Sequence, residues 1–325
     1  MRTFPQQQEG FDHLSENSCE VKKTSIGGQA LIEGVMMRGP RVSAMSVRKP
    51  DGTIYSETWE TTANRWYTKL PFVRGIFNLF SMLALGYQCL MKSADISGTS
   101  EEEDPSKLEI WLEKHLGDKM SVLFNALVTI VATVIAVGLF MLLPATLVKY
   151  LGSTLSAPNY LLTIIEGILK IVIFVLYLFA VSKTPDIHRV FQYHGAEHKT
   201  IACYEAGEEL TPENAMKYPR FHPRCGTSFM LIVLIISIIV FSVVTWSSVW
   251  MRVALKILLL PVVVSIAYEI IRFAGRHDNA FTRAISAPGL WLQNFTTFEP
   301  DASMLEVAIA SMKPCIPENQ DEDRF

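Results

Sequence analysis

The sequence predicts a mainly α-helical integral membrane protein, with about four transmembrane helices in two hairpins, a small cytoplasmic α+β part with an N-terminal β-hairpin, and a cytoplasmic helical loop rich in histidine and cysteine. Half of the 325 residues are hydrophobic and the mean hydropathy is +0.25, which is too apolar for an ordinary soluble enzyme. Four apolar runs each approach the length that a helix needs to cross a bilayer. A polar segment, residues 183–227, separates the second run from the third and holds four of the seven histidines.

Composition argues against several classes of protein. The net charge is −3 and no basic patch interleaved with aromatic residues occurs, so we expect no nucleic-acid binding. The five cysteines lack the spacing of a disulfide framework, which indicates that the polar parts face a reducing compartment. Residues 1–24 have no apolar core of the kind found in secretory signals, and they predict a disordered polar tail.

Residues 25–69 predict a cytoplasmic β-rich segment. Residues 25–40 are apolar but broken by glycines, a spacing that suits short strands and tight turns better than a helix. The residues that follow alternate around Pro50, Asp51 and Gly52, a turn signature, and predict a β-hairpin.

Residues 70–93 predict an amphipathic helix that lies in the membrane interface or is re-entrant. The run is nearly long enough to span a bilayer, but it contains Arg74 and Asn78. A span here would also carry the basic N-terminal segment to the outside of the membrane. Residues 94–120 follow as an acidic linker that leads into a short amphipathic helix.

The four apolar runs pair into two transmembrane hairpins, residues 121–182 and 228–272. The individual runs lie at about residues 121–147, 160–182, 228–248 and 252–272. The short connections within the hairpins carry few basic residues, whereas the polar segment carries six. These are Lys183, Arg189, Lys199, Lys217, Arg220 and Arg224. Because lysine and arginine are enriched in cytoplasmic loops, we expect a multi-pass protein with both termini in the cytoplasm.

The second apolar run contains two charged residues, Glu166 and Lys170. Their i,i+4 spacing allows them to form an ion pair within one helix. Charges at this depth are candidates for function, so the pair is either structural or part of a transport path.

Beyond the last run, residues 273–313 predict a cytoplasmic segment with a short helix, ASMLEVAIASMK, that packs on the N-terminal hairpin or on the membrane surface. Residues 314–325 predict a solvated acidic tail.

Within the polar segment, the pattern predicts a helix from about His194 to Ala206 that stops at Gly207. Thr211 then suits the N-cap of a second helix, because Pro212 follows at the first helical position.

This segment also contains a candidate metal site. His194 and His198 belong to an H-x-x-E-H motif, which on a helix places both imidazoles on one face, one turn apart, as a shared metal requires. Glu197 lies between them and could act as a general base towards a metal-bound water. His222 and Cys225 follow in a proline-containing loop, and together the donors suit zinc or another borderline divalent metal.

A distant acidic ligand is also expected, because the inverted zinc-protease motif that H-x-x-E-H matches uses one. Glu269 is our candidate, since antiparallel pairing of the last two runs brings it to nearly the depth of Cys225. The alternatives are that Glu269 forms a salt bridge with Arg272 or Arg276, and that the histidines cap a helix or form hydrogen bonds in a polar loop.

Four separated blocks, GGQALIEGVMMRGP, HGAEHKTIACYEAGEELTPENA, RFHPRCGTSF and PGLWLQNFTTFEPD, occur in this order. They resemble the signature blocks of the YqhQ-like family of bacterial membrane proteins, which has no established substrate and is described as a group of predicted metal-dependent enzymes. The resemblance covers residues 25–313 or so. It implies a bacterial inner-membrane location and a metal at His194, His198, His222 and Cys225.

Three functions follow as hypotheses. The first is a metal-dependent hydrolase, such as a peptidase or amidase, that acts on an unknown substrate at the cytoplasmic membrane face, with Glu197 as its catalytic base. The second is a non-catalytic scaffold or assembly factor whose metal site is closed by four protein ligands. The third is a small transporter that uses Glu166 and Lys170. Membrane lipid is an expected partner in each case, and a homo-oligomer is left open.

Overall fold

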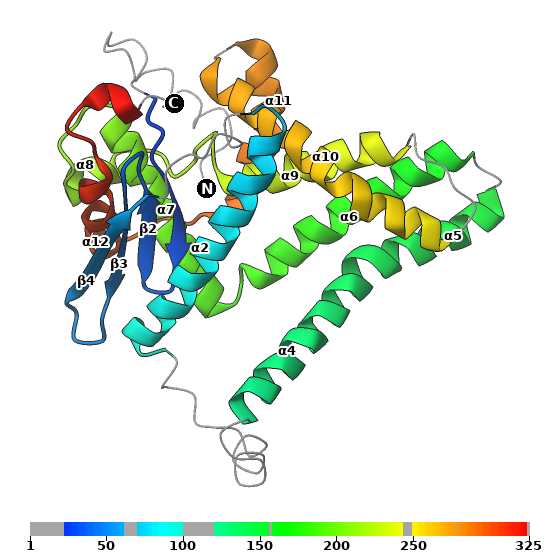
Figure 1. Cartoon of the computed structure of the whole chain (residues 1–325), viewed down its shortest axis with the longest axis horizontal. Coiled ribbons are helices and arrows are strands. Elements are labelled where there is room, and N and C mark those ends of the chain that lie inside the picture. The colour runs from blue at the N-terminus through cyan, green and yellow to red at the C-terminus, as the bar shows by residue number, and fades with distance from the viewer. Residues whose placement is uncertain are drawn as a thin grey trace.

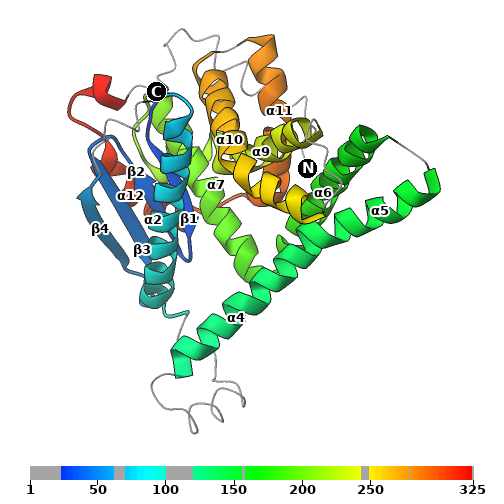
Figure 2. The same cartoon turned by 45° about the vertical axis from the view of Figure 1, so that its right-hand side comes forward.

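A computed structural model describes residues 23–61, 70–99, 120–155, 158–242, 249–277 and 279–323. The chain is mostly helical and carries a four-stranded antiparallel sheet near its N-terminus (Figure 1). The sheet and the helices packed on it lie on one side of the molecule, and the long apolar helices extend away from the other side (Figures 1 and 2).

The strands pair in sequence order, each with the next. Their bounds are β1 Gly27–Leu31, β2 Gly34–Arg38, β3 Val42–Arg48 and β4 Ile54–Glu60. The predicted strands and tight turns are confirmed: β3 and β4 form the expected hairpin, in which Gly52 takes the positive φ of 84° that the turn needs. Glu33, in the turn between β1 and β2, also has a positive φ of 52°.

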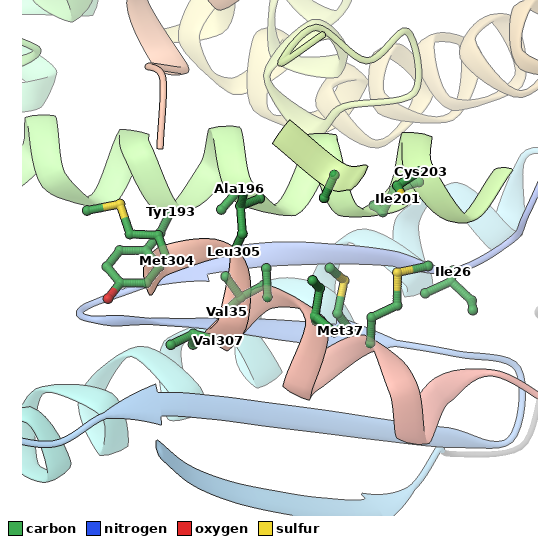
Figure 3. Packing of buried hydrophobic residues seen from close by; sticks show 14 of the residues in the cluster. Ile26, Val35, Met37, Tyr193, Ala196, Ile201, Cys203, Met304, Leu305 and Val307 are labelled. Atoms are coloured by element: carbon green, nitrogen blue, oxygen red, sulfur yellow. The ribbon is translucent and has the colours of Figure 1, made fainter. Parts of the chain in front are cut away.

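The sheet is the middle of three layers, because alternate residues of a strand point to opposite faces. Helices α7 (Pro185–Glu205) and α12 (Ala302–Met312) cover one face (Figure 3). Val35 and Met37 of β2 meet Ala196 of α7 and Leu305 of α12 there. All four side chains are fully buried, so this core fixes the position of α7.

Helix α2 (Val73–Ser97) covers the opposite face of the sheet. Leu31, Met36 and Met45 are buried there beneath Cys89 of α2. The helix that the sequence predicts over residues 70–93 is therefore present, and it continues into the first part of the predicted acidic linker before Gly98 ends it with a positive φ of 73°. The remainder of that linker, from residue 100, lies outside the described residues.

The long apolar helices follow in chain order. They are α4 (Met120–Val137), the π-helical turn η3 (Gly138–Leu142), α5 (Leu143–Leu155), α6 (Asn159–Val181), α9 (Gly226–Ser242) and α10 (Val249–Arg276). Among the described residues, three helices are long and apolar enough to cross a membrane, namely Leu127–Tyr150, Tyr160–Val181 and Ala254–Arg276. The helix at the third predicted run, α9, is shorter, with 17 described residues.

The polar segment forms α7 and α8 (Pro212–Met216). Thr211 caps α8 as predicted, since its side chain accepts a hydrogen bond from the amide of Asn214. Gly207 follows α7 with the expected positive φ of 74°. Helix α7 begins at Pro185, well before His194 where the sequence pattern places its start, because Pro185 supplies a favourable first helical position.

Helix α11 (Ala280–Thr296) lies in the C-terminal segment, ahead of the short helix that the sequence predicts there. Asn279 and Thr282 form a capping box at its start, and this local signal outweighs Pro288 inside the helix. The predicted helix near the C-terminus is confirmed as α12, and it packs on the sheet.

The C-terminal tail differs from the solvated tail that the sequence predicts. Asp323 is buried, and its carboxylate accepts hydrogen bonds from the hydroxyls of Thr24 and Tyr204 at 3.0 and 2.8 Å. Most of the predicted N-terminal tail lies outside the described residues, which begin at Lys23.

Candidate metal centre

Helix α7 carries His194 and His198, and the loop before α9 carries Cys225. One ligand atom from each of these three residues lies within 4.8 Å of the other two. His198 and Cys225 are buried and His194 is half-buried. The helix spacing therefore brings both imidazoles to one point, and the start of α9 adds the thiol.

Backbone carbonyls fix the tautomers of both histidines. His194 Nδ1–H donates to the carbonyl of Thr296 at 2.8 Å, and His198 Nδ1–H donates to the carbonyl of Arg220 at 2.7 Å. Each bond keeps a proton on Nδ1, so Nε2 is the nitrogen through which either ring would bind a metal. Such an outer hydrogen bond is usual for a histidine that binds a metal through its other nitrogen.

The third donor is a thiolate. Burial works to raise the pKa of Cys225, but the imidazoles of His194 and His198 outweigh this effect, and the pKa lies well below the usual value of a thiol. His194 Nε2 lies 3.1 Å from Cys225 Sγ. Burial works to lower the pKa of His194, but the neighbouring sulfur raises it to about 9. A thiolate is the form of cysteine that binds metals.

Glu197 is buried beside the three donors, with 5% of its surface exposed. Its Oε1 accepts a hydrogen bond from the amide of Gly28 on β1 at 3.1 Å. Its Oε2 is buried and has no hydrogen-bond partner among the described residues. Burial raises the pKa of this carboxyl, and the imidazoles of His194 and His198 oppose that effect. An unpaired buried carboxylate oxygen indicates that the site is built for a further group.

His222 lies outside the group of three donors. Its ring is 5.5 Å from that of His198, but its Nε2 lies 3.7 Å from a carboxylate oxygen of Glu205 and 3.3 Å from Arg224. Burial lowers the pKa of His222 to about 4, so the ring is neutral at physiological pH. The set of four ligands expected from the sequence is therefore a set of three in this structure.

Glu269 lies elsewhere, on α10, where it forms a two-point ion pair with Arg74 of α2. The structure does not bring it to His194, and the basic partner is neither Arg272 nor Arg276. Because Arg74 is distant in sequence, the spacing of residues within α10 gives no sign of this pairing.

Several contributors to the centre are backbone groups that residue type does not reveal, namely the carbonyls of Thr296 and Arg220 and the amide of Gly28. Gly195 offers a clearer signal. A Cβ there would collide with the carbonyl oxygen of Phe298, so glycine is needed for the close approach of this segment to α7. A glycine inside a helix often marks such a contact.

The charged pair predicted in α6 is present, and α10 adds a third member. Glu166 Oε1 accepts hydrogen bonds from Lys170 at 2.6 Å and from Lys256 at 2.9 Å. Lys256 was not among the residues that the sequence singled out. The three side chains therefore form an ion cluster that joins α6 to α10.

Comparison of the sequence with known proteins shows its family. The sequence pattern of the family "Protein of unknown function (DUF1385)" matches residues 70–318, which is most of the chain. The chain belongs to this family. It is also similar to "Uncharacterized protein YqhQ" of Bacillus subtilis (strain 168), with 35% identity over 291 residues that cover 88% of this chain and 91% of the relative. No solved structure matches the chain.

Membership of the DUF1385 family confirms the YqhQ-like resemblance. Neither name states an activity, so the function is argued from the centre itself. His194, His198, Cys225 and Glu197 all fall within the residues that the family pattern covers.

Proposed function

We propose that this protein binds one divalent metal, zinc by its donor set, at His194, His198 and Cys225, and that it is a hydrolase at the cytoplasmic face of the cell membrane. The observation that carries the proposal is that the three donor side chains are already arranged to bind a metal. Both imidazoles hold their Nδ1 protons on backbone carbonyls, which leaves Nε2 as the nitrogen for a metal, and the pKa of the Cys225 thiol is lowered well below its usual value. Two nitrogens and one sulfur suit zinc and leave a position for water.

Each residue then has a defined role. A bound metal would act as a Lewis acid and lower the pKa of water. Gly28 holds one oxygen of the Glu197 carboxylate, which leaves the unpaired Oε2 to accept a proton. The raised pKa of Glu197, caused by burial, makes this carboxylate a stronger base than an exposed glutamate.

A second candidate is a structural metal site that pins α7 to the loop before α9. The burial of the centre favours it, because His198, Glu197 and Cys225 are each less than a tenth exposed. In that version the protein would act as a scaffold or assembly factor.

Metal content tests the metal site, which both candidate functions share. Wild-type protein that has been loaded with zinc and dialysed is expected to retain about one ion per chain by elemental analysis. The His194→Ala His198→Ala double variant should lose it. His188→Ala is the matched control, since His188 lies on the same helix and its ring stacks on Phe298. Equal zinc in the double variant and in the control would contradict the proposal.

Glu197→Gln separates the two candidates. For a hydrolase, this variant should retain zinc but fail to complement a deletion of the gene, because glutamine cannot accept the proton. Full complementation by a zinc-replete variant would remove the catalytic role and leave the structural site. X-ray absorption of the wild type gives a second measure, since a coordinated water is expected only for an open site.

We also infer four membrane crossings, with the centre in the cytoplasm. The sheet, α7 and α12 share one core, so they lie on one side of the membrane. The chain must therefore cross an even number of times between β4 and α7, and again between α7 and α12. In the second interval α10 crosses, so α9 must cross as well. The six basic residues of the polar segment support a cytoplasmic core.

A further inference from the structure

Helix α2 has two apolar faces, and only one of them is covered by the residues that the structure describes. Met82, Leu85 and Leu90 pack against the sheet. On the opposite side lies a row of large exposed side chains, which we call the apolar stripe. Its members are Phe80, Leu83, Tyr87 and Met91, with exposed fractions of 66, 57, 65 and 48%. At 100° per residue these side chains fall within an arc of about 80°.

The N-terminal half of α2 lies directly against α10. Gly75 allows close contact with Tyr268, because a Cβ at Gly75 would lie 2.8 Å from the Cβ of that tyrosine. Asn78 donates a hydrogen bond to the Tyr268 hydroxyl at 2.9 Å, and Arg74 pairs with Glu269 one residue further along. Since Ala254–Arg276 is one of the helices long and apolar enough to cross a membrane, α2 begins at the level of the bilayer.

The position of α2 also suits a membrane surface. In both views α2 stands between the sheet and the long apolar helices (Figures 1 and 2). The exposed polar residues Ser81, Gln88 and Lys92 flank the stripe on one side. A helix with one apolar side and a polar edge is typical of segments that lie in the interface of a bilayer.

We propose that α2 lies flat in the cytoplasmic leaflet, with the apolar stripe against the acyl chains of the lipid. The occupant is lipid because α2 packs on α10, a helix long and apolar enough to cross a membrane, whose own side chains Val262 and Phe273 are 47 and 46% exposed. The number of crossings between β4 and α7 must be even, which excludes a span at α2. A third crossing before α7 would separate the sheet from α7, with which it shares a core. This proposal stands independently of the metal chemistry.

Fluorescence quenching by brominated lipid tests the contact. The full-length protein is reconstituted in vesicles of phosphatidylcholine with plain or dibrominated acyl chains. Phe80→Trp adds one indole to the stripe, and Thr58→Trp adds one at an exposed position of β4 as the control. All variants keep the six native tryptophans, so the added emission is obtained by difference from wild type.

The added emission of Phe80→Trp should be largely lost in brominated vesicles, whereas that of Thr58→Trp should be unchanged. Tyr87→Trp serves as a second stripe position if the first variant does not fold, and the same loss is expected there. The proposal would be overturned if a folded stripe variant showed the same added emission in plain and brominated vesicles, as the control does. If that unquenched emission then changed when the protein was diluted in the vesicles, the stripe would be assigned to contact with a second copy of the chain.

Discussion

His222 shows how burial decides the chemistry of a single side chain near the centre. The ring is buried, lies beside Glu205 and Arg224, and has its pKa lowered to about 4. An unfolded chain would protonate the same ring near pH 6.5. Between these two values the unfolded state binds more protons than the folded state, so stability must fall as the pH falls through this window.

Replacing His222 by glutamine should remove this part of the pH dependence. Between pH 7.5 and pH 5 the wild type should lose about 2 kcal/mol more of its unfolding free energy than His222→Gln does, because glutamine takes up no proton. Unfolding of both proteins in detergent with a chelator measures the difference. Parallel pH dependence of the two would show that His222 is protonated in the folded protein.

At the scale of elements, the centre depends on how closely the segment after α11 approaches α7. Gly195 allows this approach, and the same segment supplies the Thr296 carbonyl that orients His194. Phe298 adds a backbone hydrogen bond to Phe191 at 2.9 Å. The glycine between the two histidines is therefore part of the packing that positions the donors.

Gly195→Ala should push the two segments apart. The expected cost is about 1–3 kcal/mol of stability, together with weaker zinc binding, because the obstacle is a backbone carbonyl that cannot rotate away. Gly138→Ala is the matched control, since a Cβ at that helical position meets nothing within 4 Å. Thermal unfolding and zinc titration of both variants check this. An unchanged unfolding temperature and zinc affinity for Gly195→Ala would mean that the backbone adjusts without cost.

Local sequence patterns predicted the parts of this fold and centre that depend on neighbours in the chain. The pairing of His194 with His198 follows from helical spacing, and the cap at Thr211 follows from residue type. The position of His222 and the partner of Glu269 depend on residues far away in sequence, Gln293 and Arg74, so periodicity could not reveal them. The prediction of a metal itself is still to be tested.

At the scale of the whole molecule, one shared core determines the topology. The N-terminal sheet, α7 and α12 come from three distant parts of the chain and bury one another (Figure 3). In the proposed topology, the membrane helices therefore leave and return in pairs. The described part of α9 is about 25 Å long by helical rise, slightly less than the hydrocarbon core, and the apolar sequence continues with Val243 and Val244.

Reporter fusions test this pairing. Green fluorescent protein fused after residue 325 should fluoresce, because the C-terminus is expected in the cytoplasm. Alkaline phosphatase fused after residue 247, between α9 and α10, should be active, because that connection is expected outside. Inactive phosphatase there, with stable expression of the fusion, would mean that α9 does not cross.

Strand β1 connects two environments that are otherwise separate. On one side Gln29 packs against Gly86 of α2, and on the other side the neighbouring Gly28 donates its amide to Glu197. A shift of α2 would therefore reach the carboxylate through a single five-residue strand. With α2 in the leaflet as proposed, we therefore expect metal binding at the centre to differ between detergent micelles and a lipid bilayer.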